Sequence, residues 1–227
     1  MFLGHFATGL AAKPLAPRMA LPALLVAPQV LDLAWPVLVA TGVEQAHLEP
    51  GHLAASPLVL EHMPYSHSLV FALGWALGFA LGYLALTRDR RGAAVGAALV
   101  VGHWLLDWIA HGPDMQLWPG GARHGLGLWG SLPGTLAAEL GMFAVGATLY
   151  TRATRATGPI GRWGWPALAA VLTVGFVVAT VGAPPPSIDA LLAFAAAVLV
   201  VVVVAAVAID RQRPPRARRE LAPLNRR

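Results

Sequence analysis

The chain has 227 residues, of which 57% are hydrophobic and 12% are charged. Soluble domains carry about 25% charged residues, so we expect most of this chain to lie in lipid. The sequence contains no cysteine, which excludes disulfides, thiolate metal ligands and thiol nucleophiles.

In chain order, the apolar segments predict an all-α, polytopic membrane helix bundle. A membrane-spanning helix needs about 20 apolar residues, and six segments meet this length. They are approximately 19–42, 66–87, 92–111, 131–151, 164–182 and 188–209. Pro22, Pro28 and Pro36 are expected to kink or break the first span. Residues 2–12 are too short to cross and predict a re-entrant or interfacial segment.

We divide the chain into three regions. Residues 1–151 contain four spans and the polar residues considered below, and residues 152–210 add two apolar spans. Residues 211–227 are basic and broken by proline, which predicts a disordered cytoplasmic tail that contacts anionic lipid headgroups.

The basic residues predict the orientation. Arg123 is the only lysine or arginine in the loops 43–65, 112–130 and 183–187, and the others flank the opposite ends of the spans. By the positive-inside rule, both termini are cytoplasmic in a multi-pass protein of the cell membrane. The lipid bilayer is the expected partner. No nucleic-acid partner is expected, because the basic residues lie at the ends of the spans and in the tail, as the positive-inside rule predicts for a membrane protein.

Polar residues interrupt the third span in the stretch GHWLLDWIAHGPD, residues 102–114. His103, Asp107 and His111 are spaced by four, so they project from one helical face. At 1.5 Å per residue, His103 lies roughly 12 Å below His111, and Glu139 in the fourth span reaches a similar depth. His67 is expected near the mouth of the second span.

An ionised carboxylate in the hydrocarbon region costs at least about 2.5–3.5 kcal/mol. Asp32, Asp107 and Glu139 are tolerable there if they converge on a cation. Imidazole and carboxylate are ligands for zinc, manganese and iron. The pattern therefore predicts a divalent-metal site, with zinc first, open to the non-cytoplasmic side. A hydrogen-bond network that packs the helices, and a proton or ion pathway, are the alternative interpretations.

Several polar residues have two interpretations. His5 joins the site only if residues 2–12 dip back into the bundle, which Gly4 and Gly9 would permit by close packing. Asp114 is either a turn residue or a member of the site. The loop 118–134 is either an interfacial loop or a lid with glycine hinges. The histidines of the outer loops are expected on the solvated surface; they are His47, His52, His62 and His124.

A resemblance adds to this interpretation. The stretches GHFATGL, QVLDLAWP, PYSHS, GHWLLDWIAHGPD and GLGLWGSLPGTLAAEL together resemble a family of bacterial multi-pass membrane proteins, grouped with the membrane-bound, metal-dependent hydrolases of the YdjM type. The resemblance covers residues 1–151. The family's Pro-Asp-x-Asp stretch is reduced here to APQVLDL, and its Arg-x-x-Thr-His-Ser stretch to MPYSHS. The ligand order is also similar to that of zinc-dependent phospholipase C.

The resemblance implies a metal-dependent hydrolase whose ligands are His5, Asp32, His67, His103 and Asp107. The local spacing adds His111 as a ligand and Glu139 as a ligand or general base.

In this hypothesis Asp107 also takes part in catalysis, Tyr65 or Ser66 orients the substrate, and the substrate is a lipid-like molecule or a phosphoester. Two further hypotheses are a proton- or cation-handling transport protein and a structural subunit of a membrane complex or homo-oligomer.

Overall fold

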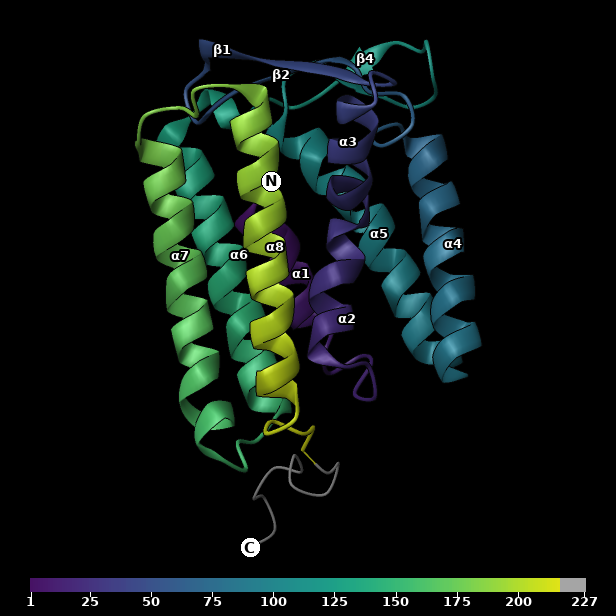
Figure 1. The fold of residues 1–227 in the computed structure, drawn as a ribbon, viewed down its shortest axis with the longest axis vertical. Helices are drawn as coiled ribbons and strands as arrows, with labels where there is room; N and C mark the ends of the chain where they lie inside the picture. The colour runs from purple at the N-terminus through teal and green to yellow at the C-terminus, as the bar shows by residue number, and fades with distance from the viewer. Residues whose placement is uncertain (217–227) are drawn as a thin grey trace, which may run out of the picture.

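The computed structural model describes residues 1–216 and confirms a mostly helical fold with six helices that could cross a membrane (Figure 1). The first crossing, Leu21–Ala40, is assembled from α2 (Leu21–Val26), the 3₁₀ turn η1 (Ala27–Gln29) and α3 (Val30–Ala40). The others are α4 (Leu69–Thr87), α5 (Arg90–Ala110), α6 (Leu132–Ala153), the π-helical turn η3 (Ile160–Gly164) continued by α7 (Trp165–Val181), and α8 (Ile188–Asp210).

The first crossing is irregular at its middle, as its prolines predict. The 3₁₀ turn contains Pro28, and Gln29 has φ −111° and ψ 6°, which is not helical. Proline lacks the N–H that would continue the helical ladder. The main-chain carbonyl of Pro28 instead accepts a hydrogen bond from another helix, as described below.

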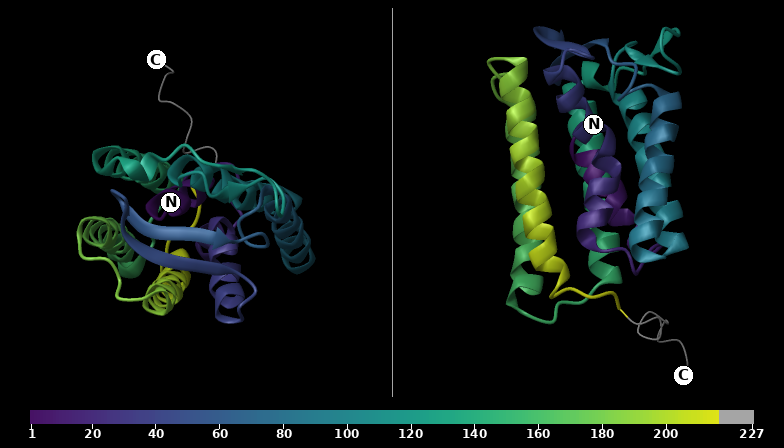
Figure 2. Two further views of the ribbon diagram at one scale, coloured as in Figure 1. Left: turned by 90° about the horizontal axis from the view of Figure 1, so that it is seen from above. Right: turned by 45° about the vertical axis from the view of Figure 1, so that its right-hand side comes forward.

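Residues 2–12 form a short helix inside the bundle. The helix α1 (Leu3–Ala11) is buried along most of its length, and Figure 2 shows it, near the N label, enclosed by the other helices when viewed from above. The re-entrant alternative therefore describes this segment. Met1 is only 6% exposed and lies within the bundle, whereas we expected the N-terminus at the end that carries the basic loops.

Close backbone contacts hold α1 in place. A Cβ atom added to Gly9 would lie 2.1 Å from the carbonyl oxygen of Leu24, and one added to Gly146 would lie 2.4 Å from that of Ala7. Side chains of α1 then share one hydrophobic cluster with α6, α7 and α8, which includes Phe6 and Tyr150. Glycine thus permits helices α2 and α6 to approach α1 at backbone distance.

Small β-structures cover one end of the bundle, where we expected only loops. The strands β1 (Gln45–Leu53) and β2 (Ser56–His62) form an antiparallel hairpin, and β3 (Met115–Gln116) pairs with β4 (Arg123–His124). The 3₁₀ turn η2 (Leu128–Gly130) follows β4, and the amide of Ala55 in the hairpin donates to the carbonyl of Trp129. The purely helical prediction missed these strands because it was based on the apolar spans, and the strands lie in the connections between them.

The opposite end carries the basic connections and the start of the tail. Arg213 is buried, and its guanidinium donates to the hydroxyl of Thr154 and the carbonyl of Gly161. Residues 211–216, which we expected in a disordered tail, are therefore attached to the α6–α7 connection. The rest of the predicted tail, residues 217–227, lies outside the described residues.

The close contact between α1 and α6 predicts a stability effect. Gly146→Ala should lower the melting temperature of the purified protein, because overpacking at a site of this kind costs about 1–3 kcal/mol. The matched control is Gly141→Ala on the same helix, where the added Cβ would meet nothing within 4 Å. Equal melting temperatures for the two variants would contradict this packing.

Candidate metal centre

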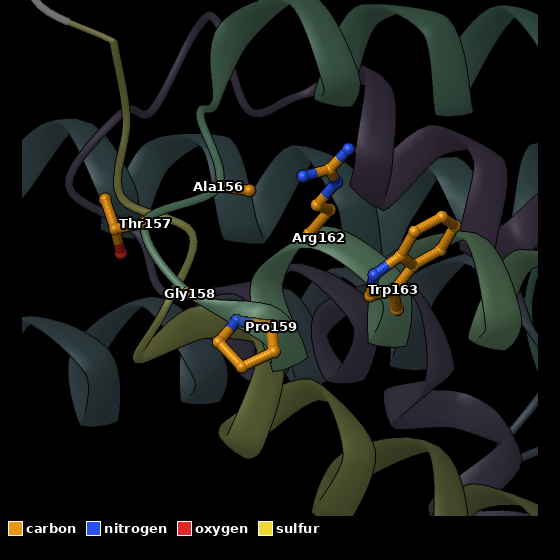
Figure 3. A pocket seen from close by; sticks show the side chains of 6 residues that line it. All are labelled: Ala156, Thr157, Gly158, Pro159, Arg162 and Trp163. Carbon is orange, nitrogen blue, oxygen red and sulfur yellow. The ribbon is translucent and has the colours of Figure 1, made fainter.

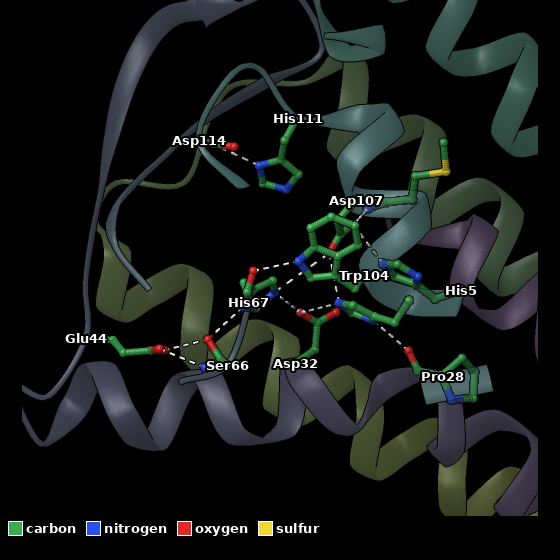
Figure 4. Close-up of polar contacts among 12 residues, drawn as sticks. His5, Pro28, Asp32, Glu44, Ser66, His67, Trp104, Asp107, His111 and Asp114 are labelled. Atoms are coloured by element: carbon green, nitrogen blue, oxygen red, sulfur yellow. Dashed lines mark hydrogen bonds and ion pairs between the residues drawn. The ribbon is translucent and has the colours of Figure 1, made fainter. Parts of the chain in front are cut away.

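Five polar residues from different elements meet inside the bundle. His5 comes from α1, Asp32 from α3 and His67 from the turn before α4, whereas His103 and Asp107 lie on α5. Four of the five are at least nine-tenths buried; Asp32 is the more accessible member, with a side chain 32% exposed. Figure 4 shows the side chains of His5, Asp32, His67 and Asp107 pointing toward one another.

The spacing of four on α5 produces the expected neighbour contact. Nε2 of His103 lies 2.8 Å from Oδ2 of Asp107. Side chains four residues apart lie on the same helix face, one turn above the other. His103 belongs to two groups whose candidate ligand atoms lie within 4.8 Å of one another: one with His5 and Asp107, the other with Asp32 and His67.

Two of the imidazoles, those of His67 and His103, each lie near both carboxylates. Nε2 of His67 lies 3.6 Å from Oδ1 of Asp32 and 3.7 Å from Oδ2 of Asp107. Nε2 of His103 lies 3.7 Å from the same Asp32 oxygen. A tetrahedral zinc site with bonds of about 2.0–2.1 Å has ligand atoms about 3.3 Å apart. These contacts scatter around that value.

A hydrogen bond to the main chain determines the tautomer of His103. Its Nδ1 lies 2.6 Å from the carbonyl oxygen of Pro28, and because a carbonyl only accepts, Nδ1 must carry the hydrogen. The neutral ring then has its lone pair on Nε2, which faces the two carboxylates. This buried Nε2 makes no hydrogen bond of acceptable geometry, although Asp107 is close. A lone pair opposite carboxylate oxygens is stabilised by a cation between them.

His5 extends the cluster on the side of α1. Its ring stacks on that of His103 with centroids 3.8 Å apart, and its Nε2 lies 3.1 Å from Oδ1 of Asp107. The amino group of Met1 also contacts this oxygen of Asp107. Nδ1 of His5 is buried and has no hydrogen-bond partner. The two carboxylates, three imidazoles and an orphaned ring nitrogen fit a divalent cation.

His111 was predicted as a ligand but belongs to neither group. Helix α5 ends at Ala110, and His111 has an extended backbone with ψ 158°, so it leaves the helical face of Asp107. Its Nδ1 lies 3.2 Å from Oδ2 of Asp114, and its ring lies 4.2 Å from that of Trp129. The sequence Gly112-Pro113 follows, and the helix ends one residue before the spacing rule assumed.

Glu139 lies at the depth we expected but is also in neither group. Its Oε2 accepts the amides of Phe2, Leu3 and Gly4 at 3.0, 2.7 and 3.1 Å. These are amides at the N-terminus of α1, which have no helical acceptor and carry a partial positive charge. The observed contacts of Glu139 are thus those of a helix cap rather than of a ligand or general base.

The remaining predicted residues surround the cluster. Tyr65 is 39% exposed, its ring contacts that of Phe71, and it belongs to neither His/Asp group. Ser66 is fully buried and contacts His67. Asp114 pairs with His111, as noted above. The histidines of the outer loops are not in the cluster, and His47 pairs instead with Glu61 across the hairpin at 3.1 Å.

Sequence reasoning missed Glu44. It directly precedes β1 and is 1% exposed, although it lies in a segment that we expected to be a polar loop. Both of its carboxylate oxygens accept hydrogen bonds from the turn that carries His67. The only signal in the sequence is an acidic residue at the end of a span, which is too common to indicate burial.

A pocket of about 410 Å³ lies at the opposite, basic end, in the α6–α7 connection (Figure 3). Its lining includes Thr157, Pro159 and Trp163, and the guanidinium of Arg162 lies 5.4 Å from the Trp163 ring. None of the five cluster residues lines it. The candidate site is therefore the buried cluster and not this surface pocket.

Comparison of the chain with protein-family models, with curated proteins and with solved structures finds no match. The assignment of a function therefore depends on the geometry of the cluster.

The contacts of Glu139 predict a loss of stability and not of metal. Glu139→Ala should lower the melting temperature, since each buried amide left without an acceptor costs about 1–3 kcal/mol. Glu139→Gln keeps one oxygen acceptor and should lose less. Both variants should retain the zinc stoichiometry of the unmodified protein, measured by elemental analysis. Loss of zinc at an unchanged melting temperature would instead make Glu139 a ligand.

Proposed function

We propose that this protein is an integral membrane metal-dependent hydrolase that holds a divalent cation with His5, Asp32, His67, His103 and Asp107. One observation supports the proposal most directly: the Nε2 atoms of His67 and His103 face the carboxylates of Asp32 and Asp107 at 2.8–3.7 Å, close to the distance of about 3.3 Å between two ligand atoms of one zinc ion. Nitrogen and oxygen donors without thiolate favour zinc, with manganese or iron as alternatives.

A bound divalent cation would supply Lewis-acid activation of water near neutral pH. The chain's own residues would hold the ligand set and leave it open on one side. Asp32 is the partly exposed member, so access is expected beside α3. His103 is held by the carbonyl of Pro28, and Asp107 lies between His5 and His103. This arrangement keeps the donor atoms converged before a substrate arrives.

His111 is better placed for proton transfer than for metal binding. Its pairing with Asp114 orients the ring through Nδ1, and we propose that Nε2 is the atom that transfers a proton. It directly follows Ala110, the last residue of the helix that carries Asp107. We therefore assign to His111 the acid–base role that the sequence had given to Glu139.

The substrate class follows from the surroundings of the cluster. The site lies between helices whose outer faces are apolar, and a lipid-like molecule or its phosphoester headgroup could approach from the bilayer. The resemblance of the sequence motifs to those of the YdjM-type hydrolases would imply the same class of activity.

Two other functions use the same residues. A proton- or cation-handling transport protein would use the buried His/Asp pairs as a relay. A structural subunit would use them only to join α1, α3 and α5, which the contact of the Met1 amino group with Asp107 would suit. Metal content separates these functions from a metalloenzyme.

Metal content should depend on the cluster. The protein purified in detergent should bind zinc, and His103→Ala and Asp107→Asn should each lose it, because each removes a donor from the shell. His124→Ala, at an exposed histidine, is the matched control and should bind as the unmodified protein does. If the unmodified protein binds no divalent ion, and His103→Ala changes only the melting temperature, the cluster has a packing role.

The orientation can be tested because the chain has no cysteine. Ala54→Cys lies in the hairpin turn and Thr157→Cys in the basic α6–α7 connection, and both positions are exposed. With the basic end cytoplasmic, an impermeant maleimide should label Ala54→Cys on intact cells, and Thr157→Cys only after permeabilisation. The reverse pattern would place the hairpin end in the cytoplasm.

A further inference from the structure

Glu44 is a buried carboxylate outside the metal cluster. Its Oε1 accepts the amides of Tyr65 and Ser66, both at 2.8 Å, and its Oε2 lies 2.5 Å from the hydroxyl oxygen of Ser66. No lysine or arginine pairs with it in the part of the chain that the structure describes. Its charge is thus met by three hydrogen-bond donors from the turn before α4.

These contacts fix the direction of each hydrogen bond. A carboxylate only accepts, so the hydroxyl hydrogen of Ser66 points to Glu44. A hydroxyl has one hydrogen, so the oxygen of Ser66 must accept at its second contact, with Nδ1 of His67 at 2.7 Å. Nδ1 of His67 therefore carries the hydrogen of the neutral ring, and Nε2 carries the lone pair.

The lone pair of His67 faces the proposed metal position. Its Nε2 is the atom that lies 3.6 Å from Asp32 and 3.7 Å from Asp107. His103, the other histidine whose Nε2 faces Asp32 and Asp107, is held in the same tautomer by the carbonyl of Pro28. Figure 4 shows the line of contacts from Glu44 through Ser66 to His67. Metal-binding histidines commonly donate their other ring N–H to such an acceptor.

We infer that Glu44 and Ser66 are positioning residues that hold His67 in its Nδ1–H tautomer and thereby keep its Nε2 available to the metal ion. The inference concerns the same site and rests on the proposed function. It also connects the base of the β1–β2 hairpin to the cluster, since Glu44 directly precedes β1.

The order of these residues excludes a serine nucleophile. In a Ser-His-acid triad the imidazole lies between the hydroxyl and the carboxylate and removes the hydroxyl proton. Here the hydroxyl of Ser66 lies between Glu44 and His67 and donates away from the imidazole. Ser66 is also fully buried. The three residues are therefore suited to orienting His67 and not to attacking a substrate.

The variant Glu44→Gln separates positioning from folding. Its side-chain oxygen can still accept the amides of Tyr65 and Ser66, which keeps the turn. Its amide nitrogen would now donate to the Ser66 hydroxyl, so that this hydroxyl donates to Nδ1 of His67. The ring would then carry its hydrogen on Nε2, which removes the lone pair from the metal position.

The experiment measures zinc affinity by chelator competition and the His67 tautomer by ¹⁵N NMR of the metal-free protein labelled at histidine. Glu44→Gln should weaken zinc binding about 10- to 100-fold, as loss of such a partner commonly does. It should also move the hydrogen of His67 from Nδ1 to Nε2. The matched control is Glu49→Gln, whose side chain is 61% exposed in the same hairpin and should change neither readout.

The outcomes separate this inference from the proposed function. Unchanged affinity and an unchanged tautomer in Glu44→Gln would overturn the inference and leave the metal site intact. If the unmodified protein binds no divalent ion, the proposed function fails, and the tautomer shift alone then supports or overturns the inference. If Glu44→Gln does not fold, Ser66→Ala takes its place: it removes the acceptor from Nδ1, and unchanged zinc affinity and tautomer would overturn the inference.

Discussion

Two carboxylates and three imidazoles face one another inside a bundle whose outer surface is apolar, and the arrangement of the helices depends on satisfying them. An unpaired carboxylate at this depth costs several kcal/mol, so Asp32 and Asp107 cannot be left without positive partners. In their neutral tautomers, His67 and His103 present the lone pair of Nε2 to these carboxylates, whereas Nε2 of His5 donates to Asp107. The buried His/Asp groups could hold a metal ion, and such an ion would be a positive partner for both carboxylates.

Irregular helices make this convergence possible. The half-length helix α1 begins within the bundle, and the first crossing changes to a 3₁₀ turn at Pro28. Both features expose main-chain groups at membrane depth, where each must find a partner. The amides at the start of α1 bind Glu139, and the carbonyl of Pro28 binds His103. The backbone thus supplies acceptors and donors that a regular helix would have used itself.

The sequence alone determined the six spans, because length and hydropathy suffice to identify a helix that can lie in lipid. It also indicated the contact of His103 with Asp107, since both lie within one regular helix and the spacing of four fixes their relation. His5, Asp32 and His67 were expected at the site from their places in or beside the apolar segments and from the motif resemblance, and the fold brings them together from separate elements.

The tertiary structure decided what local spacing could not. His111 left the predicted face because α5 ends one residue earlier, and Glu139 turned to the amides of α1, whose position no periodicity specifies. The burial of Glu44 could not be predicted from the sequence, because it depends on how the segment before the hairpin packs against the turn that carries His67. Periodicity reports the neighbours of a residue within one helix, whereas hydrogen-bond partners between elements are set by how the chain packs.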